Sequence, residues 1–170
     1  RAFVAQGWRA VRFNVRGVGR SGGTWDDGRG EVDDLLAVVQ HQWRDAAAGV
    51  AMPLALAGFS FGGYVAASAA HRLQADGHAV QPLVLVSPAV ARNGMPPVPP
   101  HTLVVEGEVD DVVPLPSILD WARPQGLPVT VVPGAGHFFH GQLGTLKQLV
   151  ASHLLACRPG APVDEAAEQP

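Results

Sequence analysis

A serine lies in a glycine-flanked turn near the middle of this 170-residue sequence, where residues 58–62 read Gly-Phe-Ser-Phe-Gly. An apolar, strand-like run precedes the turn, and an alanine-rich, helix-like run follows it. In that context the G-x-S-x-G pattern holds Ser60 in a strained turn above a sheet, at the positive end of a helix. We expect Gly58 and Gly62 to give the clearance that such a tight turn needs. The pattern favours a nucleophile for acyl transfer; the alternative is a plain connection in which Ser60 caps the helix.

Two further polar groups follow later apolar runs. An acidic segment at 106–111 comes after the run 103–105, and His137 comes shortly after the run 129–132. Because the carboxyl ends of parallel strands meet at one edge of a sheet, we expect the hydroxyl, the acid and the imidazole to lie together there. The imidazole would accept the proton of Ser60, and a carboxylate would orient the imidazole.

Other residues suggest other sites. His137 and His140 would suit zinc, but a third ligand at suitable spacing is missing, so we expect no metal and no cofactor. The glycines of 16–23 lack the lysine of a phosphate-binding loop. The acidic residues of 31–34 are expected to form a solvated first turn of a helix rather than a metal site. Further histidines, which follow no strand run closely, are His41, His71, His78, His101 and His153.

Apolar runs alternate with segments of helical periodicity along the chain. The expected strands are 8–15, 54–59, 83–86, 103–105 and 129–132. The expected helices are 1–6, 30–48, 64–75, 116–123 and 142–156. This order predicts an α/β fold, a mostly parallel sheet with helices on both faces, over residues 1–157. Residues 158–170 are rich in Pro, Ala, Glu and Gln and are expected to be a disordered tail.

Composition narrows the class of protein. Hydrophobic residues make up 47% of the chain and charged residues 16%, which is typical of a globular domain. A net charge of −3 without a basic cluster argues against a nucleic-acid partner, and no apolar run reaches the length of a membrane span. A single cysteine, Cys157, fits a reducing, cytoplasmic location. The expected partner is a small molecule, and the sequence does not distinguish a monomer from a homodimer.

Four stretches together resemble an α/β-hydrolase, and most closely the small lid-poor bacterial hydrolases related to dienelactone hydrolase: 16–21, 58–63, 107–114 and 134–139. The resemblance implies a carboxylesterase-like serine hydrolase that cleaves small esters or related acyl compounds through a Ser-His-Asp triad and an acyl-enzyme. Its Gly-x-x-Asp pattern assigns the acid to Asp110, with Asp111 as the alternative.

The same resemblance assigns roles around the serine. The backbone N–H of Phe61 would be one donor of the oxyanion hole. Phe59 and Phe138 are candidate substrate-binding residues, although Phe138 and Phe139 would equally suit an ordinary core.

The sequence departs from the family in two places. The family has further strands before residue 8, including one between 8–15 and 54–59 whose loop supplies the second oxyanion donor. We therefore expect an N-terminally truncated chain, in which the two flanking strands pair directly or leave a slot, and an inactive scaffold used for binding is one alternative function. Between Ser87 and Leu103 a proline-rich connection is too short for a helical cap, so an open site is expected. Peptidase, thioesterase or acyltransferase activity on the same triad is the other alternative.

Overall fold

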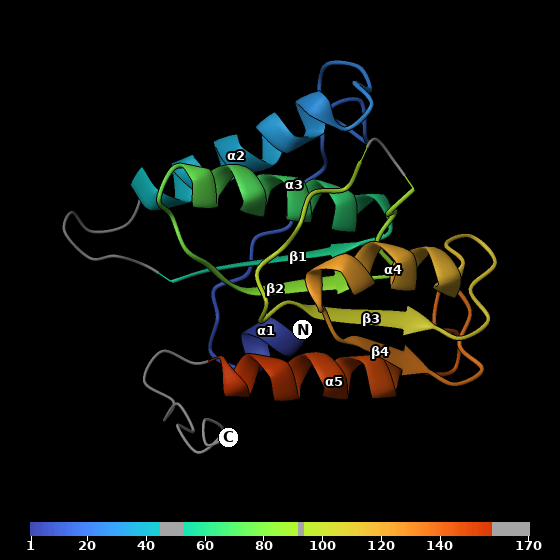
Figure 1. The fold of residues 1–170 in the computed structure, drawn as a ribbon. Helices are drawn as coiled ribbons and strands as arrows, with labels where there is room; N and C mark the ends of the chain where they lie inside the picture. Colours follow the sequence, from blue (N-terminus) through green and yellow to red (C-terminus); the bar gives the residue numbers. More distant parts are fainter. Residues whose placement is uncertain (45–52, 92–93, 158–170) are drawn as a thin grey trace.

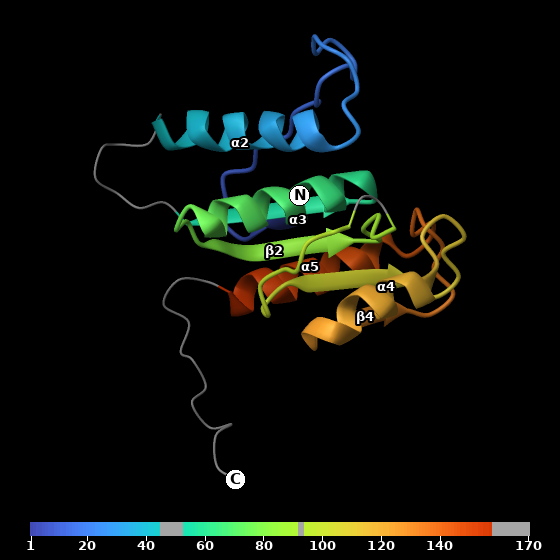
Figure 2. The ribbon, with the colours of Figure 1, turned by 45° about the horizontal axis from the view of Figure 1, so that its top comes forward.

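A computed structural model describes residues 1–44, 53–91 and 94–157. Its centre is a parallel sheet in the order β1-β2-β3-β4, formed by β1 (Leu54–Phe59), β2 (Val80–Val86), β3 (Leu103–Gly107) and β4 (Val129–Val132). The helices are α1 (Ala2–Ala5), α2 (Arg29–Arg44), α3 (Phe61–Ala75), α4 (Leu115–Ala122) and α5 (Leu143–Ala156). Helices α3 and α4 lie on one face of the sheet and α1 and α5 on the other, while α2 packs on the outside of α3 (Figures 1 and 2). The predicted α/β class with a parallel sheet is confirmed.

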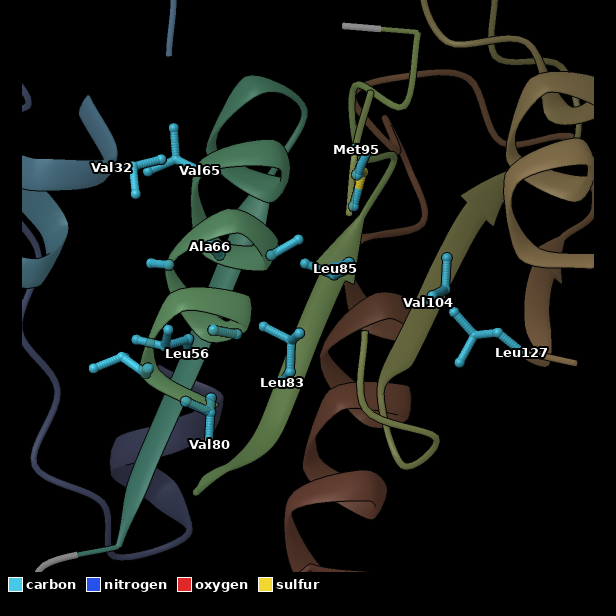
Figure 3. Packing of buried hydrophobic residues seen from close by; sticks show 14 of the residues in the cluster. Val32, Leu56, Val65, Ala66, Val80, Leu83, Leu85, Met95, Val104 and Leu127 are labelled. Atoms are coloured by element: carbon cyan, nitrogen blue, oxygen red, sulfur yellow. The ribbon is translucent and has the colours of Figure 1, made fainter. Parts of the chain in front are cut away.

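The apolar runs form a sheet that is buried on both faces. In β2, Leu83 and Leu85 belong to the core under α3, whereas Val84 and Val86 belong to the core against α5. Successive side chains of a strand point to opposite faces, so an unbroken apolar run serves two cores. The alanines of α3 let it lie close over β1 and β2, and Val65 on its outer side meets Val32 of α2 (Figure 3).

The predicted strand at 8–15 is wrong. This segment is irregular and largely exposed, including the alternating Val11 and Phe13. Alternation of apolar and polar residues favours a strand, but a strand forms only where a neighbouring strand completes its backbone hydrogen bonds. Among the described residues β1 is the edge of the sheet, and 8–15 does not pair with it. Of the two expected arrangements, direct pairing is therefore excluded.

The other elements agree with the predictions to within a few residues. Helix α3 begins at Phe61, directly after the serine, and β2 begins three residues before the predicted strand. Helix α2 is described to Arg44, so the rest of the predicted helix 30–48 lies outside the described residues, as does the predicted tail 158–170. None of the described residues between Ser87 and Leu103 is helical. The described helices include none long and apolar enough to span a bilayer.

Candidate active site

Ser60 occupies a strained turn between β1 and α3. Its φ of 52° and ψ of −120° lie in a region that residues with a side chain rarely adopt. Surrounding backbone fixes this conformation: the Ser60 N–H donates to the carbonyl of Val86 at 2.9 Å, and its carbonyl accepts from Ala89 at 3.1 Å. The hydroxyl makes no capping hydrogen bond to the described helix, which argues against the capping interpretation.

The two glycines of the turn differ in importance. A Cβ on Gly58 would lie 2.0 Å from the carbonyl oxygen of Gly62, so position 58 excludes every side chain. The expectation for Gly62 is wrong, because a Cβ there would meet no atom within 4 Å. The second close approach is at Gly63, where a Cβ would lie 2.9 Å from the Cβ of Pro88. The turn requires the backbone of residue 62 to lie against Gly58, but it leaves room for a side chain at position 62.

A buried imidazole–carboxylate pair lies at the carboxyl ends of β3 and β4. The Nδ1 of His137 is 2.7 Å from Oδ2 of Asp110, and both side chains are almost fully buried. Asp111, the alternative acid, is exposed. The His137 ring also lies against Phe59, with 4.8 Å between ring centroids, which brings it beside the residue that precedes Ser60. The sheet therefore gathers the predicted hydroxyl, acid and imidazole at one edge, where the arrowheads lie in Figure 1.

Backbone donors keep the carboxyl group of Asp110 ionised. Its Oδ1 accepts from the N–H groups of Val112 at 2.8 Å and Val113 at 2.7 Å. Burial alone would raise the pKa of Asp110, but these bonds and the contact with His137 outweigh it and hold the pKa below its usual value. An ionised Asp110 accepts the Nδ1 proton of His137, which leaves Nε2 as the basic nitrogen.

A second acid, Glu106, lies beneath this pair and was missed as an individual residue in the sequence. It is 0% exposed, and its Oε1 accepts from the Ser87 hydroxyl and from the Gly107 N–H, each at 2.9 Å. Burial and the neighbouring Asp110 raise the pKa of Glu106 to about 8. Its place directly after the apolar run Val104-Val105 was the available signal, because a residue that continues a buried strand is itself buried.

Glu106 should make stability depend on pH. Because its pKa is about 8 in the folded protein and about 4.5 when unfolded, stability falls as pH rises from about 4.5 to about 8. E106Q keeps the shape and removes this loss. We expect its free energy of unfolding, relative to the unsubstituted protein, to rise with pH across that range by at most about 1.4 kcal/mol per pH unit. Urea unfolding of both proteins at pH 4.5, 6 and 7.5 measures the two free energies of unfolding. A difference between them that stays constant with pH would contradict the raised pKa of Glu106.

Aromatic side chains form an exposed rim beside the imidazole. Phe59 is 42% exposed and Phe138 58% exposed, with their ring centroids 6.0 Å apart. Phe138 also meets His137 edge-on at 5.1 Å. Phe139 points the other way and is part of the core against α5, so only Phe138 of the two is available to a ligand. The substrate-binding role of Phe59 and Phe138 stays a prediction.

Trp25 packs against Phe61, the residue that follows Ser60, with 4.4 Å between ring centroids. Phe61 is the first residue of α3, so its backbone N–H lies at the helix N-terminus next to Ser60. The oxyanion-hole role of the Phe61 N–H stays a prediction. Trp25 stands in a loop, where no spacing rule applies, and its contact with Phe61 could not be predicted from the sequence.

The loop that carries Trp25 is held by two acids that were expected to be solvated. Glu31 is fully buried and accepts from the backbone N–H groups of Asp26 and Gly28, both at 2.8 Å. Asp34 pairs with Arg16 at 2.8 Å, and the hydrogen bond from Arg16 lowers its pKa. The expectation of a solvated first turn is therefore wrong for Glu31, because the preceding loop folds back over the start of α2. Asp34 is partly exposed and ion-paired, and Asp33 is exposed as expected.

A strained serine between a parallel strand and a helix, with an acid and a histidine after later strands, defines the α/β-hydrolase fold. Residues 1–124 match the model of the family described as "Serine aminopeptidase, S33", and the chain belongs to this family. The resemblance inferred from the four sequence stretches is thus confirmed at the level of the superfamily.

Solved structures agree with this assignment. An α/β serine hydrolase without a lid from Xanthomonas campestris is 34% identical with a TM-score of 0.74; the match covers 89% of this chain and 67% of that one. An α/β serine hydrolase homologue from Coxiella burnetii is 38% identical with a TM-score of 0.69, covering 84% of this chain and 67% of that one. An uncharacterized protein of Rickettsia prowazekii is 26% identical over 161 residues, 89% of this chain and 67% of its own length.

Proposed function

We propose that the protein is a serine hydrolase that cleaves small carboxylic esters through an acyl-enzyme. The observation that carries this proposal is the buried 2.7 Å contact between His137 and Asp110 at the sheet edge that also carries the strained Ser60. Buried pairs of ionisable groups and strained residues cluster at functional sites, and here both occur at the same sheet edge.

The proposed reaction uses four groups of the chain. The Ser60 hydroxyl attacks the acyl carbon while His137 Nε2 takes its proton and passes it to the departing alcohol. Asp110 holds the imidazole through Nδ1 and stabilises its charged form. The Phe61 N–H stabilises the negative oxygen of the tetrahedral intermediate. A water molecule then attacks the acyl-enzyme with His137 as the base, and the carboxylic acid product leaves Ser60.

We infer an open site that suits short, soluble esters. None of the described residues between Ser87 and Leu103 forms a helical cap, and Phe59 and Phe138 offer an exposed apolar rim rather than a deep tunnel. The substrate is proposed as the partner, without nucleic acid or membrane. A cytoplasmic location is proposed from the single free Cys157.

The length of the acyl chain that the protein prefers tests whether the site is open. We expect the full-length protein to hydrolyse p-nitrophenyl acetate and butyrate with kcat/KM about tenfold or more above the palmitate ester, because an exposed rim buries little of a long chain. Pre-steady-state release of p-nitrophenol in a burst would support the acyl-enzyme. A preference for the palmitate ester would contradict the open site, and activity that S60A retains would contradict the role of Ser60 as nucleophile. A folded full-length protein without activity on any of these esters would favour a binding scaffold.

A peptidase is the second candidate, because the family is described as a serine aminopeptidase. The same triad would serve it. Amino-acid p-nitroanilides assayed beside the esters separate the two, since a peptidase would turn over the anilide and an esterase would not.

A further inference from the structure

Glu106 is a buried acid that the proposed reaction does not use. It is the fourth residue of β3 and fully buried, at the strand end from which the loop to Asp110 departs. Isolated carboxyl groups are rarely buried, because the charged form loses its hydration. Its position therefore calls for a role tied to its neighbours.

The hydrogen bonds of Glu106 are those of a carboxylic acid. Both donors that reach it, the Ser87 hydroxyl and the Gly107 N–H, bind the same oxygen, Oε1. Oε2 is buried and receives no hydrogen bond from any N–H or O–H group of the described residues. The side chain of Glu106 is instead hydrogen-bonded to that of Asp110, which raises the pKa of Glu106 and lowers that of Asp110. An acceptor oxygen with two donors and a second oxygen without any fits a group whose proton is on Oε2.

The neighbours of Glu106 reinforce this assignment. The charged group that acts on it is Asp110, with the His137 imidazole on the other side of Asp110. Ser87 contributes a neutral hydroxyl from the end of β2, and its own φ of 38° shows that the surrounding structure holds it in place. Two buried carboxylates this close cannot both be ionised without strong repulsion. Asp110 is the one kept ionised, by Val112 and Val113.

We propose that Glu106 is a positioning residue for the triad: as a neutral acid it supports Asp110 against His137, and when ionised it disrupts that pair. This inference rests on the proposed function, because the pair matters to catalysis only if Ser60 and His137 react. In the neutral form, Glu106 ties the end of β3 to Ser87 beside the end of β2 and is hydrogen-bonded to Asp110. In the ionised form, its charge drives Asp110 to move away or take up a proton, and either change weakens the bond to His137 Nδ1.

The consequence is a loss of activity on the alkaline side. Since the pKa of Glu106 is about 8, kcat should fall as pH rises through that value, with little change in KM. E106Q presents the same oxygen to its two donors and an N–H in place of the acid proton, and it carries no charge at any pH. We expect E106Q to keep kcat within about threefold at pH 7 and to lose the alkaline decline. A residue with a merely structural role would not change the pH profile.

Two matched variants sharpen the test. The Ser87 hydroxyl lowers the pKa of Glu106, so S87A should move the alkaline decline to higher pH. Glu108 is exposed and its carboxylate accepts from the Gly134 N–H, so E108Q removes a nearby charge without touching the buried acid. E108Q should leave the decline where it is in the unsubstituted protein.

The experiment measures kcat and KM for p-nitrophenyl acetate from pH 6 to 10 in the full-length protein and the three variants. In parallel, proton NMR follows the downfield Nδ1–H resonance of His137, which reports the pair without any turnover. We expect that resonance to weaken above pH 8 in the unsubstituted protein and to persist in E106Q.

The outcomes separate the inference from the proposed function. An alkaline decline that is unchanged in E106Q, or an Nδ1–H signal with the same pH dependence in both proteins, overturns the role of Glu106 while leaving the hydrolase intact. A protein without esterase activity overturns the hydrolase, and the NMR comparison still decides whether Glu106 controls the Asp110–His137 pair.

Discussion

D110N is expected to lower kcat on small esters by about 10⁴-fold with little change in KM. The structure fixes how the new amide would sit. Val112 and Val113 both donate to one oxygen of Asp110, so the amide oxygen of asparagine must take that place. The amide NH₂ then faces His137 Nδ1 and donates to it, which puts the imidazole proton on Nε2. The proposed base would hold a proton where it must accept one.

D111N is the matched control, because Asp111 is the exposed neighbour that the sequence left as the alternative acid. Its kcat should stay within about threefold of the unsubstituted protein. Circular dichroism spectra of both variants establish that the fold is retained. Comparable losses in D110N and D111N, or a D110N protein of nearly full activity, would remove Asp110 from the proposed mechanism.

G58A is expected to destabilise the protein by about 3 kcal/mol or more. The added Cβ would lie 2.0 Å from the Gly62 carbonyl oxygen and 2.5 Å from the Gly63 nitrogen, and these are backbone atoms that cannot rotate away. Relief would require β1 to separate from the start of α3, but Ser60 is bonded to the end of β2. The cost therefore falls on the turn that holds the proposed nucleophile.

G62A provides the comparison within the same motif. A Cβ at Gly62 would meet no atom within 4 Å, and alanine is favoured over glycine in the first turn of a helix. We expect the free energy of unfolding of G62A to lie within about 1 kcal/mol of the unsubstituted protein, on either side. Urea unfolding curves for the two variants decide the matter, and equal destabilisation by both would show that the turn is not limited by the contact at Gly58.

Much of the fold could be predicted because its strands are buried on both faces. Runs such as 83–86 and 103–105 have no exposed side, so their composition alone marks them as strands of a parallel sheet. The segment 8–15 shows the limit of this reasoning. Its alternation is as regular as that of a strand, but pairing is a property of the neighbouring backbone, which local composition does not contain.

The candidate site also contains residues that could be predicted from the sequence and residues that could not. Ser60, Asp110 and His137 follow strand ends, so sequence order and sheet geometry are enough to bring them to one edge. The burial of Glu106 could be inferred from its place at the end of a buried strand, but its hydrogen bond with Ser87 could not. Trp25 depends on a long-range contact with Phe61, which no spacing in the sequence records.

The most direct test of the proposed mechanism is covalent labelling with a fluorophosphonate, with the modified residue located by tandem mass spectrometry. The account predicts one adduct, on Ser60, that S60A abolishes and D110N slows by about 10³-fold or more, because the label requires a serine activated by a correctly protonated imidazole. Labelling at a different residue, or no labelling of a folded full-length protein, would contradict it.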